Sequence, residues 1–336
     1  MTPRRFVKYL AVGLIRNEFI IDRVGKAHNN VPGGSLLYAG TALKQWGGVT
    51  GLLGVVSDQF PREKIDCLTQ RGLDIRGIKT TSEMQNHDVF YAYPDENGSV
   101  QNSPVAMYAA NHLPLPRELL DYVNKAVGDA ESSPEPRIYP EDIPPDYLDA
   151  SAAHICPLDL ALQLQLSTLL QRGSIRSMTI QPHPTAMVPD KLEEIALLTK
   201  DTKAVFTHET DLRALFKGVL DVIWEMMERL SDYGSQYIVV KNTFNGYSLY
   251  QREYGKRFQI PEYPTRHVDP TGQMDVFCAA FLAGLHETYD PEHALCLGAV
   301  AASIKGEGTG PFYITESLPG LDQARVAALR DQIVRY

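Results

Sequence analysis

Short apolar runs alternate with amphipathic stretches along most of the chain. The segments FVKYLAVGLI (6–15), VTGLLGVV (49–56) and QYIVVKN (236–242) are nearly continuous apolar runs, which is typical of strands buried on both faces of a sheet. Two shorter runs predict further strands at 174–180 and 203–208. Helical spacing predicts the helices 35–48, 61–72, 191–199 and 211–230, and glycine ends the first of them while proline begins the second.

Strands that alternate with helices in this way predict a three-layer α/β/α sandwich with a mostly parallel central sheet. A small additional β element is expected within 88–107, because residues 88–101 alternate in polarity and contain Asn97-Gly98, a strong hairpin signal. Five prolines between residues 131 and 145 predict a surface loop. With no internal repeat in evidence, we expect one domain spanning residues 1–336.

The overall charge and the cysteines narrow the classes of function. A net charge of −9 argues against a nucleic-acid surface, which needs a concentrated basic patch, although a polyphosphate can still bind backbone N–H groups and a divalent metal. The four cysteines are widely spaced and form no CxxC pair, as expected for free thiols in a reducing compartment. No run approaches the ~18 apolar residues of a membrane span. We therefore expect a cytoplasmic protein that binds neither nucleic acid nor membrane.

The stretch RHVDPTGQMDVFCAAFLAGL (266–285) carries the candidate chemistry. Its polar first half leads into apolar and small residues on one helical face, so a helix is expected to begin close to Gly272–Asp275. The unpaired N–H groups of that helix end, together with its dipole, favour an anion. Asp275 in the first turn could be a simple helix cap, or a base that takes a proton from a hydroxyl beside a bound phosphoryl group. The local pattern leaves both readings open.

Five segments together resemble the ribokinase-like, or PfkB, carbohydrate kinases. DPTGQMDVFCAAFLAGL is similar to the family's C-terminal signature D-T-x-G-A-G-D-x-F, and PGGSLLYAGTALKQWG resembles its N-terminal G-G-x-x-x-N-x-A signature. YAANHL (108–113), FTHETDL (206–212) and IVVKNTFNGYSLY (238–250) resemble three further family segments and follow in the family's order. Because each motif is weak alone, the order of all five carries the resemblance.

The resemblance implies a ribokinase-like kinase that transfers a phosphoryl group from ATP, with magnesium, to a hydroxyl of a sugar, polyol or nucleoside. It implies that Asp275 is the catalytic base and that segments 14–30 and 84–111 form a β-lid over this small-molecule acceptor. It further implies a possible monovalent cation and a homodimer formed through the lid. The other implied site residues are Gly272, Gln273 and Met274 in the anion hole; Glu18, Gly33, Gly34, Tyr38 and Asn111 at the acceptor; His208, Lys241, Gly246 and Thr271 at the nucleotide; Asp211 at magnesium; and Asp269 at the monovalent cation.

The chain departs from the family pattern at three places. Gln273-Met274 replaces the usual Ala-Gly, Tyr38 replaces the usual Asn, and His208 with Asp211 replaces the Asn and Glu of N-x-x-E. These changes leave a second hypothesis open, namely a ribokinase-fold protein that binds a nucleotide or polyol without efficient transfer. The backbone at Met274 separates the two, because a positive φ there, or a side chain in the phosphate position, would favour the binding protein.

Overall fold

The computed structural model describes residues 6–82, 87–95, 98–100, 102–120, 122, 137–244 and 246–336. Its main sheet has ten strands, parallel to one another from β11 to β5, and the antiparallel strands β12, β13 and β14 extend one edge. In spatial order they are β14 (Val334–Arg335), β13 (Lys256–Ile260), β12 (Tyr247–Gln251), β11 (Tyr237–Lys241), β10 (Ala204–His208), β9 (Ser177–Ile180), β8 (Ala152–Ile155), β1 (Tyr9–Val12), β4 (Thr50–Ser57) and β5 (Asp74–Thr81).

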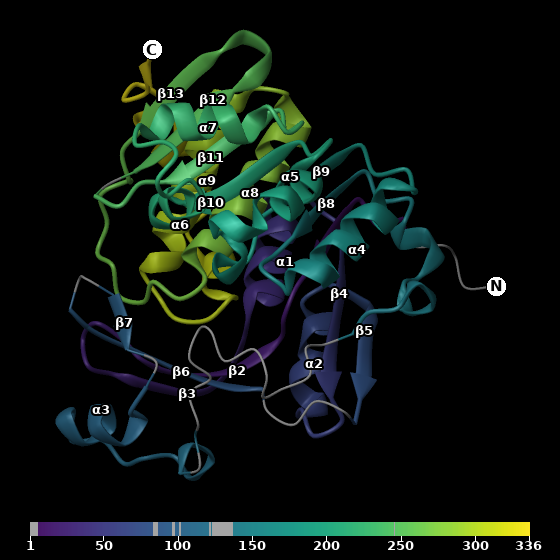
Figure 1. Cartoon of the computed structure of the whole chain (residues 1–336). Coiled ribbons are helices and arrows are strands. Elements are labelled where there is room, and N and C mark those ends of the chain that lie inside the picture. Colours follow the sequence, from purple (N-terminus) through teal and green to yellow (C-terminus); the bar gives the residue numbers. More distant parts are fainter. Residues whose placement is uncertain are drawn as a thin grey trace.

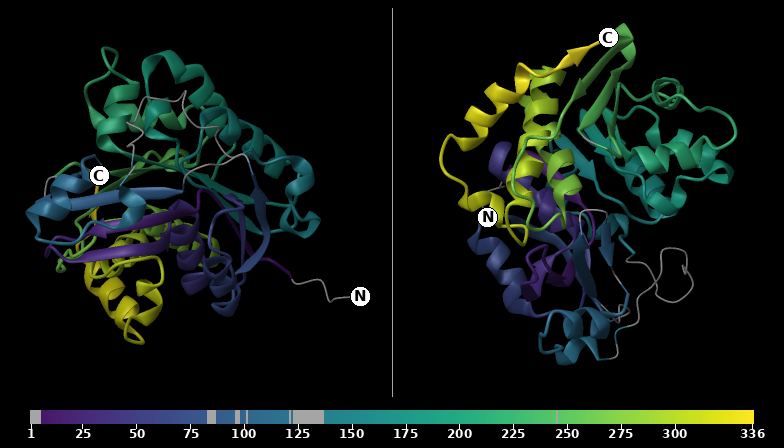
Figure 2. Two further views of the ribbon diagram at one scale, coloured as in Figure 1. Left: turned by 90° about the horizontal axis from the view of Figure 1, so that it is seen from below. Right: turned by 90° about the vertical axis from the view of Figure 1, so that its left-hand side faces the viewer.

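Helices cover both faces of this sheet (Figures 1 and 2). One face packs against α1 (Ser35–Trp46), α2 (Arg62–Gln70), α8 (Gln273–Thr288), α9 (Pro291–Gly306) and α10 (Leu321–Arg330). The other face packs against α4 (Leu160–Gln171), α5 (Leu192–Thr199), α6 (Glu209–Leu215) and α7 (Ile223–Ser231). The expected α/β sandwich with a mostly parallel sheet is therefore confirmed.

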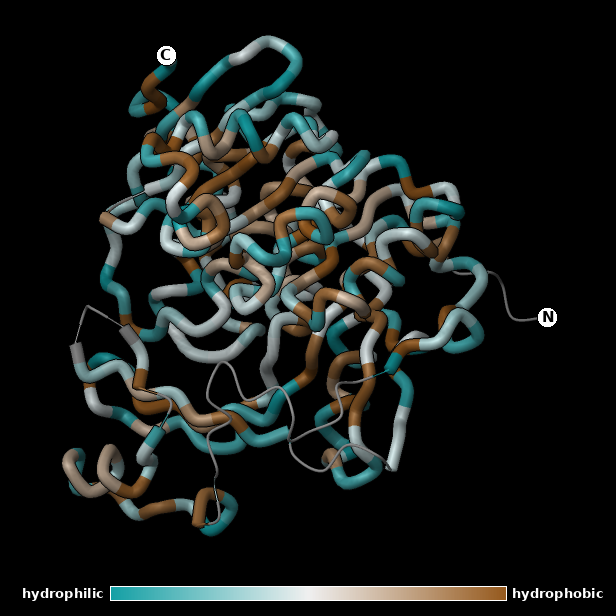
Figure 3. The backbone as a smooth tube through the Cα atoms, in the orientation of Figure 1, coloured by the Kyte–Doolittle hydropathy of each residue, from teal (hydrophilic) through white to brown (hydrophobic). Residues whose placement is uncertain are grey.

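The apolar strand sequences explain the two cores. In β1, Tyr9 and Ala11 join the core beneath α1 and α8, whereas Leu10 and Val12 join the core beneath α4. Successive side chains point to opposite faces, so a strand buried on both sides must be apolar at every position. In Figure 3 the strands of the central sheet are accordingly mostly brown.

A separate four-stranded sheet lies below the main body in Figure 1. Its order is β3 (Ala27–Gly33), β2 (Arg16–Ile21), β6 (Asp88–Asp95) and β7 (Gly98–Val100). Phe19 and Phe90 pack with Tyr108 of α3 (Pro104–Ala110) on one face of this sheet. β2, β6 and β7 lie within the segments 14–30 and 84–111 that were expected to form the lid, and β3 extends past the first segment to Gly33. Residues 84–86, 96, 97 and 101 lie outside the described residues. We call this sheet with α3 the lid.

Two predictions about helices were wrong. The stretch 211–230 forms two helices, α6 and α7, because Gly218 adopts a φ of 78° that a right-handed helix cannot contain. The apolar residues after Asp275 do not mark one face, since every residue from Val276 to Leu285 is buried. A helix apolar all round is buried all round, and α8 packs between α1, α9 and the sheet.

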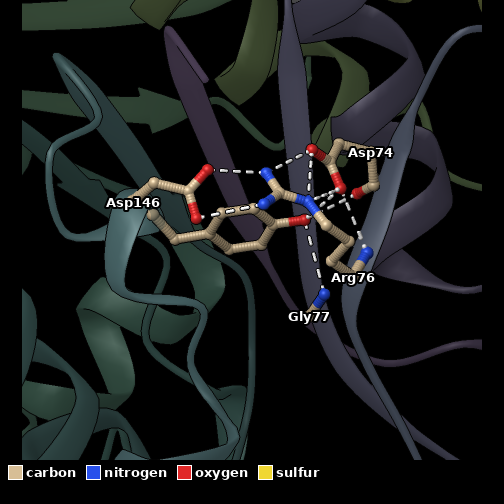
Figure 4. A network of polar contacts seen from close by, with 5 residues as sticks. Asp74, Arg76, Gly77 and Asp146 are labelled. Carbon is tan, nitrogen blue, oxygen red and sulfur yellow. Dashed lines mark hydrogen bonds and ion pairs between the residues drawn. The ribbon is translucent and has the colours of Figure 1, made fainter. Parts of the chain in front are cut away.

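The segment after the proline-rich region is fastened to the edge strand β5 (Figure 4). Arg76 binds the carboxylates of Asp74 and Asp146, each at 2.6 Å, and the Tyr147 hydroxyl donates to Asp74 at 2.9 Å. Bidentate pairing of this kind fixes geometry more than it adds stability at an exposed site. Within the part of the chain that is described, no helix is long and apolar enough to span a membrane.

Candidate active site

The N-terminus of α8 is built by a glycine that no other residue could replace. Gly272 has a φ of 74°, and a Cβ there would overlap the ring of Tyr38. α8 begins at the next residue, and Asp275 lies in its first turn. The prediction that Asp275 stands at the start of a buried helix is confirmed.

Burial changes the acidity of Asp275. Removal from water raises its pKa to about 7, while the charge of His208 and its own backbone N–H act in the opposite direction. A carboxyl group with a pKa near 7 both accepts and returns protons at neutral pH, which suits a general base. A helix cap alone would not require this burial.

The two residues that depart from the family's anion-hole pattern turn their side chains to neighbouring helices and the core. Gln273 donates its side-chain amide to the Ala302 carbonyl of α9 at 3.0 Å. Met274 has helical backbone geometry and packs against the core beneath α1 and α8. Neither residue needs a positive φ, so the strain expected of a methionine at this place does not arise. The Gln273 N–H donates to the Pro270 carbonyl at 3.1 Å, and the Asp275 N–H acts on its own carboxylate. The N–H groups of Gly272 and Met274 remain as candidate donors to an anion.

Glu18, Gly33, Gly34 and Tyr38 come together although they lie on β2, β3 and α1. The Glu18 carboxylate accepts hydrogen bonds from the Gly34 N–H at 2.8 Å and the Tyr38 hydroxyl at 2.7 Å. A Cβ at Gly33 would overlap this carboxylate, and Gly34 has a φ of 88°. Burial raises the pKa of Glu18 to about 7, although the two hydrogen bonds act to lower this pKa. Tyr38, in place of the family's Asn, therefore binds the acidic group of the expected acceptor site.

Two tyrosines of β6 were missed by the sequence analysis. Burial raises the pKa of Tyr91, and the charges of Glu18 and Asp275 raise it further. The Tyr93 hydroxyl lies 2.9 Å from the Thr271 hydroxyl. Since Phe90 and Ala92 face the lid core, strand alternation turns Tyr91 and Tyr93 toward the main body. That alternation was the signal in the sequence.

Asp269 binds a buried lysine that the sequence analysis also missed. Its Oδ1 accepts the Thr271 N–H at 2.9 Å, and its Oδ2 lies 3.5 Å from Lys305 Nζ. Both side chains are fully buried. Thr271, expected along the nucleotide, is thus held between Asp269 and the lid. The signal for Lys305 was a single cation at the end of the apolar run of α9.

The expected nucleotide residues lie at the ends of β10 and β11. Gly246 has a φ of 73° and closes the turn between β11 and β12, where its carbonyl accepts the Asn242 N–H at 3.0 Å. Lys241 pairs with Glu262, and burial lowers its pKa to about 8. His208 and Lys241 are direct partners in the parallel pairing of β10 with β11.

Asp211 and Asn111 have different surroundings. Asp211 lies in the first turn of α6, with its carboxylate 3.5 Å from His208. One carboxylate beside bound phosphates is a usual magnesium site, so Asp211 fits this role without the three-residue metal cluster that the described residues lack. Asn111 donates to the Met107 carbonyl at 2.9 Å and faces Gly25 inside the lid, and neither contact joins it to Glu18.

Comparisons with known proteins agree with this architecture. The profile of the pfkB family of carbohydrate kinases matches residues 10–312. A cytidine kinase of Thermococcus kodakarensis is 27% identical over 293 residues, covering 85% of this chain and 91% of that protein. A 5-dehydro-2-deoxygluconokinase of Clostridium perfringens is 31% identical over 80 residues, covering 24% of this chain and 23% of that protein.

Solved structures show the same fold at low identity. A putative ribokinase II from E. coli in complex with ATP and Mg²⁺ has a TM-score of 0.69 at 17% identity, covering 96% of this chain and 99% of its own. A nucleoside kinase of Burkholderia thailandensis in complex with inosine has a TM-score of 0.67 at 16% identity, covering 96% and 98%.

The main sheet and the small separate sheet together form the ribokinase-like fold. Because the profile matches most of the chain, the protein belongs to the pfkB family of carbohydrate kinases. It is a phosphotransferase with an alcohol group as acceptor.

Proposed function

We propose that the protein transfers the γ-phosphoryl group of ATP to a hydroxyl of a sugar, polyol or nucleoside, with Asp275 as the base. The observation that carries this proposal is the Asp275 carboxyl group, which lies at the N-terminus of a buried helix with its pKa raised to about 7. The cytidine kinase and nucleoside kinase among the similar proteins support nucleosides as one acceptor class.

In the proposed reaction, the oxygen of the acceptor hydroxyl attacks the γ-phosphorus while Asp275 accepts the proton of that hydroxyl. The bond from this phosphorus to the β–γ bridging oxygen breaks, and ADP leaves. The backbone N–H groups of Gly272 and Met274, at the positive end of the α8 dipole, stabilise the charge of the transferring group. Magnesium held by Asp211, when bound, would neutralise phosphate charge.

The acceptor would bind between the lid and the main body. Glu18, the Gly33-Gly34 backbone and Tyr38 form the proposed floor of that site, because they meet in one hydrogen-bonded group. The lid contacts the loop before α8 through the hydroxyl groups of Tyr93 and Thr271, so a closed lid would exclude water from the reacting hydroxyl. His208, Lys241 and the turn at Gly246 would lie along the nucleotide.

A screen of ATP consumption over sugars, polyols and nucleosides tests the proposal. We expect turnover with at least one acceptor, and its loss in Asp275→Asn. The departures from the family pattern keep the binding protein as the alternative. ATP binding without turnover on any acceptor would favour that alternative, and an active Asp275→Asn variant would contradict the role of Asp275.

A further inference from the structure

The ammonium group of Lys305 is enclosed by oxygen atoms. Lys305 Nζ donates to the carbonyl of Asp269 at 3.1 Å and to the carbonyl of Gly308 at 2.9 Å, and it lies 3.5 Å from Asp269 Oδ2. An ammonium group has three donors and no acceptor. The two carbonyls accept two of these donors, and the Asp269 carboxylate balances the charge of the ammonium without a hydrogen bond to its Oδ2. The side chain is fully buried, and this set of contacts is closed to solvent.

These partners are the kind that a monovalent metal ion binds. Carbonyl and carboxylate oxygens replace the hydration shell of such an ion, and Asp269 is the residue that the family resemblance gives to a monovalent cation. Here the same carboxylate and carbonyl already face a covalently attached cation. A metal ion added beside Nζ would bring a second positive charge into a buried site, at a large electrostatic cost.

A series of hydrogen bonds and side-chain contacts connects Lys305 to the start of α8. Val268 and Asp269 donate their N–H groups to the Gly306 carbonyl at 2.7 and 3.1 Å, next to Lys305. Asp269 in turn holds the Thr271 N–H at 2.9 Å, and Gly272 follows directly. Lys305 Nζ also lies 5.4 Å from the centre of the Tyr38 ring, against which Gly272 packs.

We propose that Lys305 is a built-in cation that replaces the monovalent metal ion of the phosphate-binding loop. Its ammonium holds residues 268–272 and supplies a positive charge next to the loop that leads into α8. Lys305 is thus a positioning residue, and the protein works without potassium. The inference rests on the proposed kinase function only for its activity measurement, because thermal stability reports on the same site independently.

The first experiment uses the unaltered protein. Its melting temperature and turnover are measured in KCl, NaCl and tetramethylammonium chloride at equal ionic strength. Tetramethylammonium is too large for a buried site and serves as the cation that cannot enter. We expect the same melting temperature and turnover in all three salts, because Lys305 already occupies the cation position. A clear gain in stability or turnover specific to potassium would overturn the proposal.

The second experiment removes the ammonium and leaves space. Lys305→Ala should melt at a lower temperature in tetramethylammonium chloride and lose turnover by about tenfold or more, because the loop that leads to the start of α8 loses the cation that holds it in position. Potassium or ammonium ions should restore part of both losses by entering the vacated position. Lys200→Ala, at an exposed lysine, serves as the control and should respond equally to all salts.

A purely structural role of Lys305 would lower the stability of Lys305→Ala without any recovery specific to potassium or ammonium, and this result would contradict the proposal. If Lys305→Ala does not fold, the response of the unaltered protein to potassium still tests the proposal. If no acceptor is found, the melting temperatures of the two proteins in the different salts test it without an activity measurement.

Discussion

At the scale of single residues, the candidate site contains two carboxyl groups that burial makes weakly acidic. Asp275 and Glu18 both have a pKa raised to about 7, but their surroundings differ. Glu18 accepts two hydrogen bonds, from Gly34 and Tyr38. For Asp275, the rise in pKa is counteracted mainly by the charge of His208. The group that is bound on both sides suits substrate positioning, and the less engaged group suits proton transfer.

Asp275→Asn should reduce turnover by about 10²–10⁴-fold, because the amide keeps the shape of the carboxyl group but cannot accept the acceptor's proton. Nucleotide affinity should change little, since the proposed nucleotide contacts lie at His208, Lys241 and Gly246. Steady-state kinetics and nucleotide titration measure the two effects. If Asp275 is only a helix cap, the variant will lose a little stability and keep its turnover.

The rate should depend on pH through the same group. Asp275 must be deprotonated to act as a base, so kcat should fall as the pH drops through about 7, the value to which burial raises its pKa. A pH–rate profile of the enzyme saturated with acceptor measures this. A flat profile from about pH 5 to about pH 8 would contradict a base with a pKa in this range.

The stability should follow the opposite sign. The pKa of Asp275 rises from an ordinary 3.8 to about 7 on folding, so the stability due to its protonated form is complete below 3.8 and is lost as the pH rises through about 7. Asp275→Asn has no carboxyl group to deprotonate, so it does not lose this stability as the pH rises. The variant should therefore gain in melting temperature relative to the unaltered protein as the pH rises, and differential scanning calorimetry at several pH values measures the gain. A constant difference would contradict it.

At the scale of elements, the start of α8 accepts two substitutions that appeared disruptive. The sequence allowed the view that Met274 crowds the phosphate, in which case Met274→Gly would raise turnover. In the structure Met274 is helical and packs on the core. The apparent conflict arose because the sequence does not show in which direction a side chain leaves a helix end.

Met274→Gly should therefore fail to raise turnover and should instead weaken the helix start by about 1 kcal/mol, the cost of glycine in a helix, plus the lost core contact. Urea unfolding together with kcat measures both. Met274→Ala is the matched control, since it removes the same side chain while keeping a good helix former. An increase in kcat in both variants would show that the methionine does obstruct the phosphoryl group.

At the scale of the whole molecule, the lid sheet ends in two strands that each have one strand neighbour among the described residues. The order β3-β2-β6-β7 leaves β3 and β7 at the margins of the described lid sheet, and the middle of β3 is exposed. Unpaired strand edges favour pairing with another chain. The lid is tied to the main body through Tyr93 and Thr271, so pairing between two lids would reach the site directly.

We predict a homodimer formed through these edges, with two-fold symmetry. Sedimentation equilibrium at micromolar concentration should show twice the chain mass of 37.4 kDa. Dilution until the dimer dissociates should then lower the activity, because the lids would lose their support. A monomer at micromolar concentration, or an activity per chain that does not change on dissociation, would contradict the prediction.

The sequence by itself determined the layered fold and the place of Asp275. Apolar strands buried on both faces, glycine before α8 and small residues within it are local requirements of backbone geometry and burial, so they are written in the local pattern. The single helix predicted at 211–230 was wrong because a left-handed glycine interrupted an otherwise helical pattern.

Only the tertiary structure decided which distant residues meet. Glu18 and Tyr38 on β2 and α1, Tyr91 on the lid, and Lys305 with Asp269 form the polar groups around the site. Each of these residues has an ordinary local sequence. Their partners follow from the packing of the lid and α9 against the start of α8, and a buried charge is explained only by the oxygen atoms that surround it.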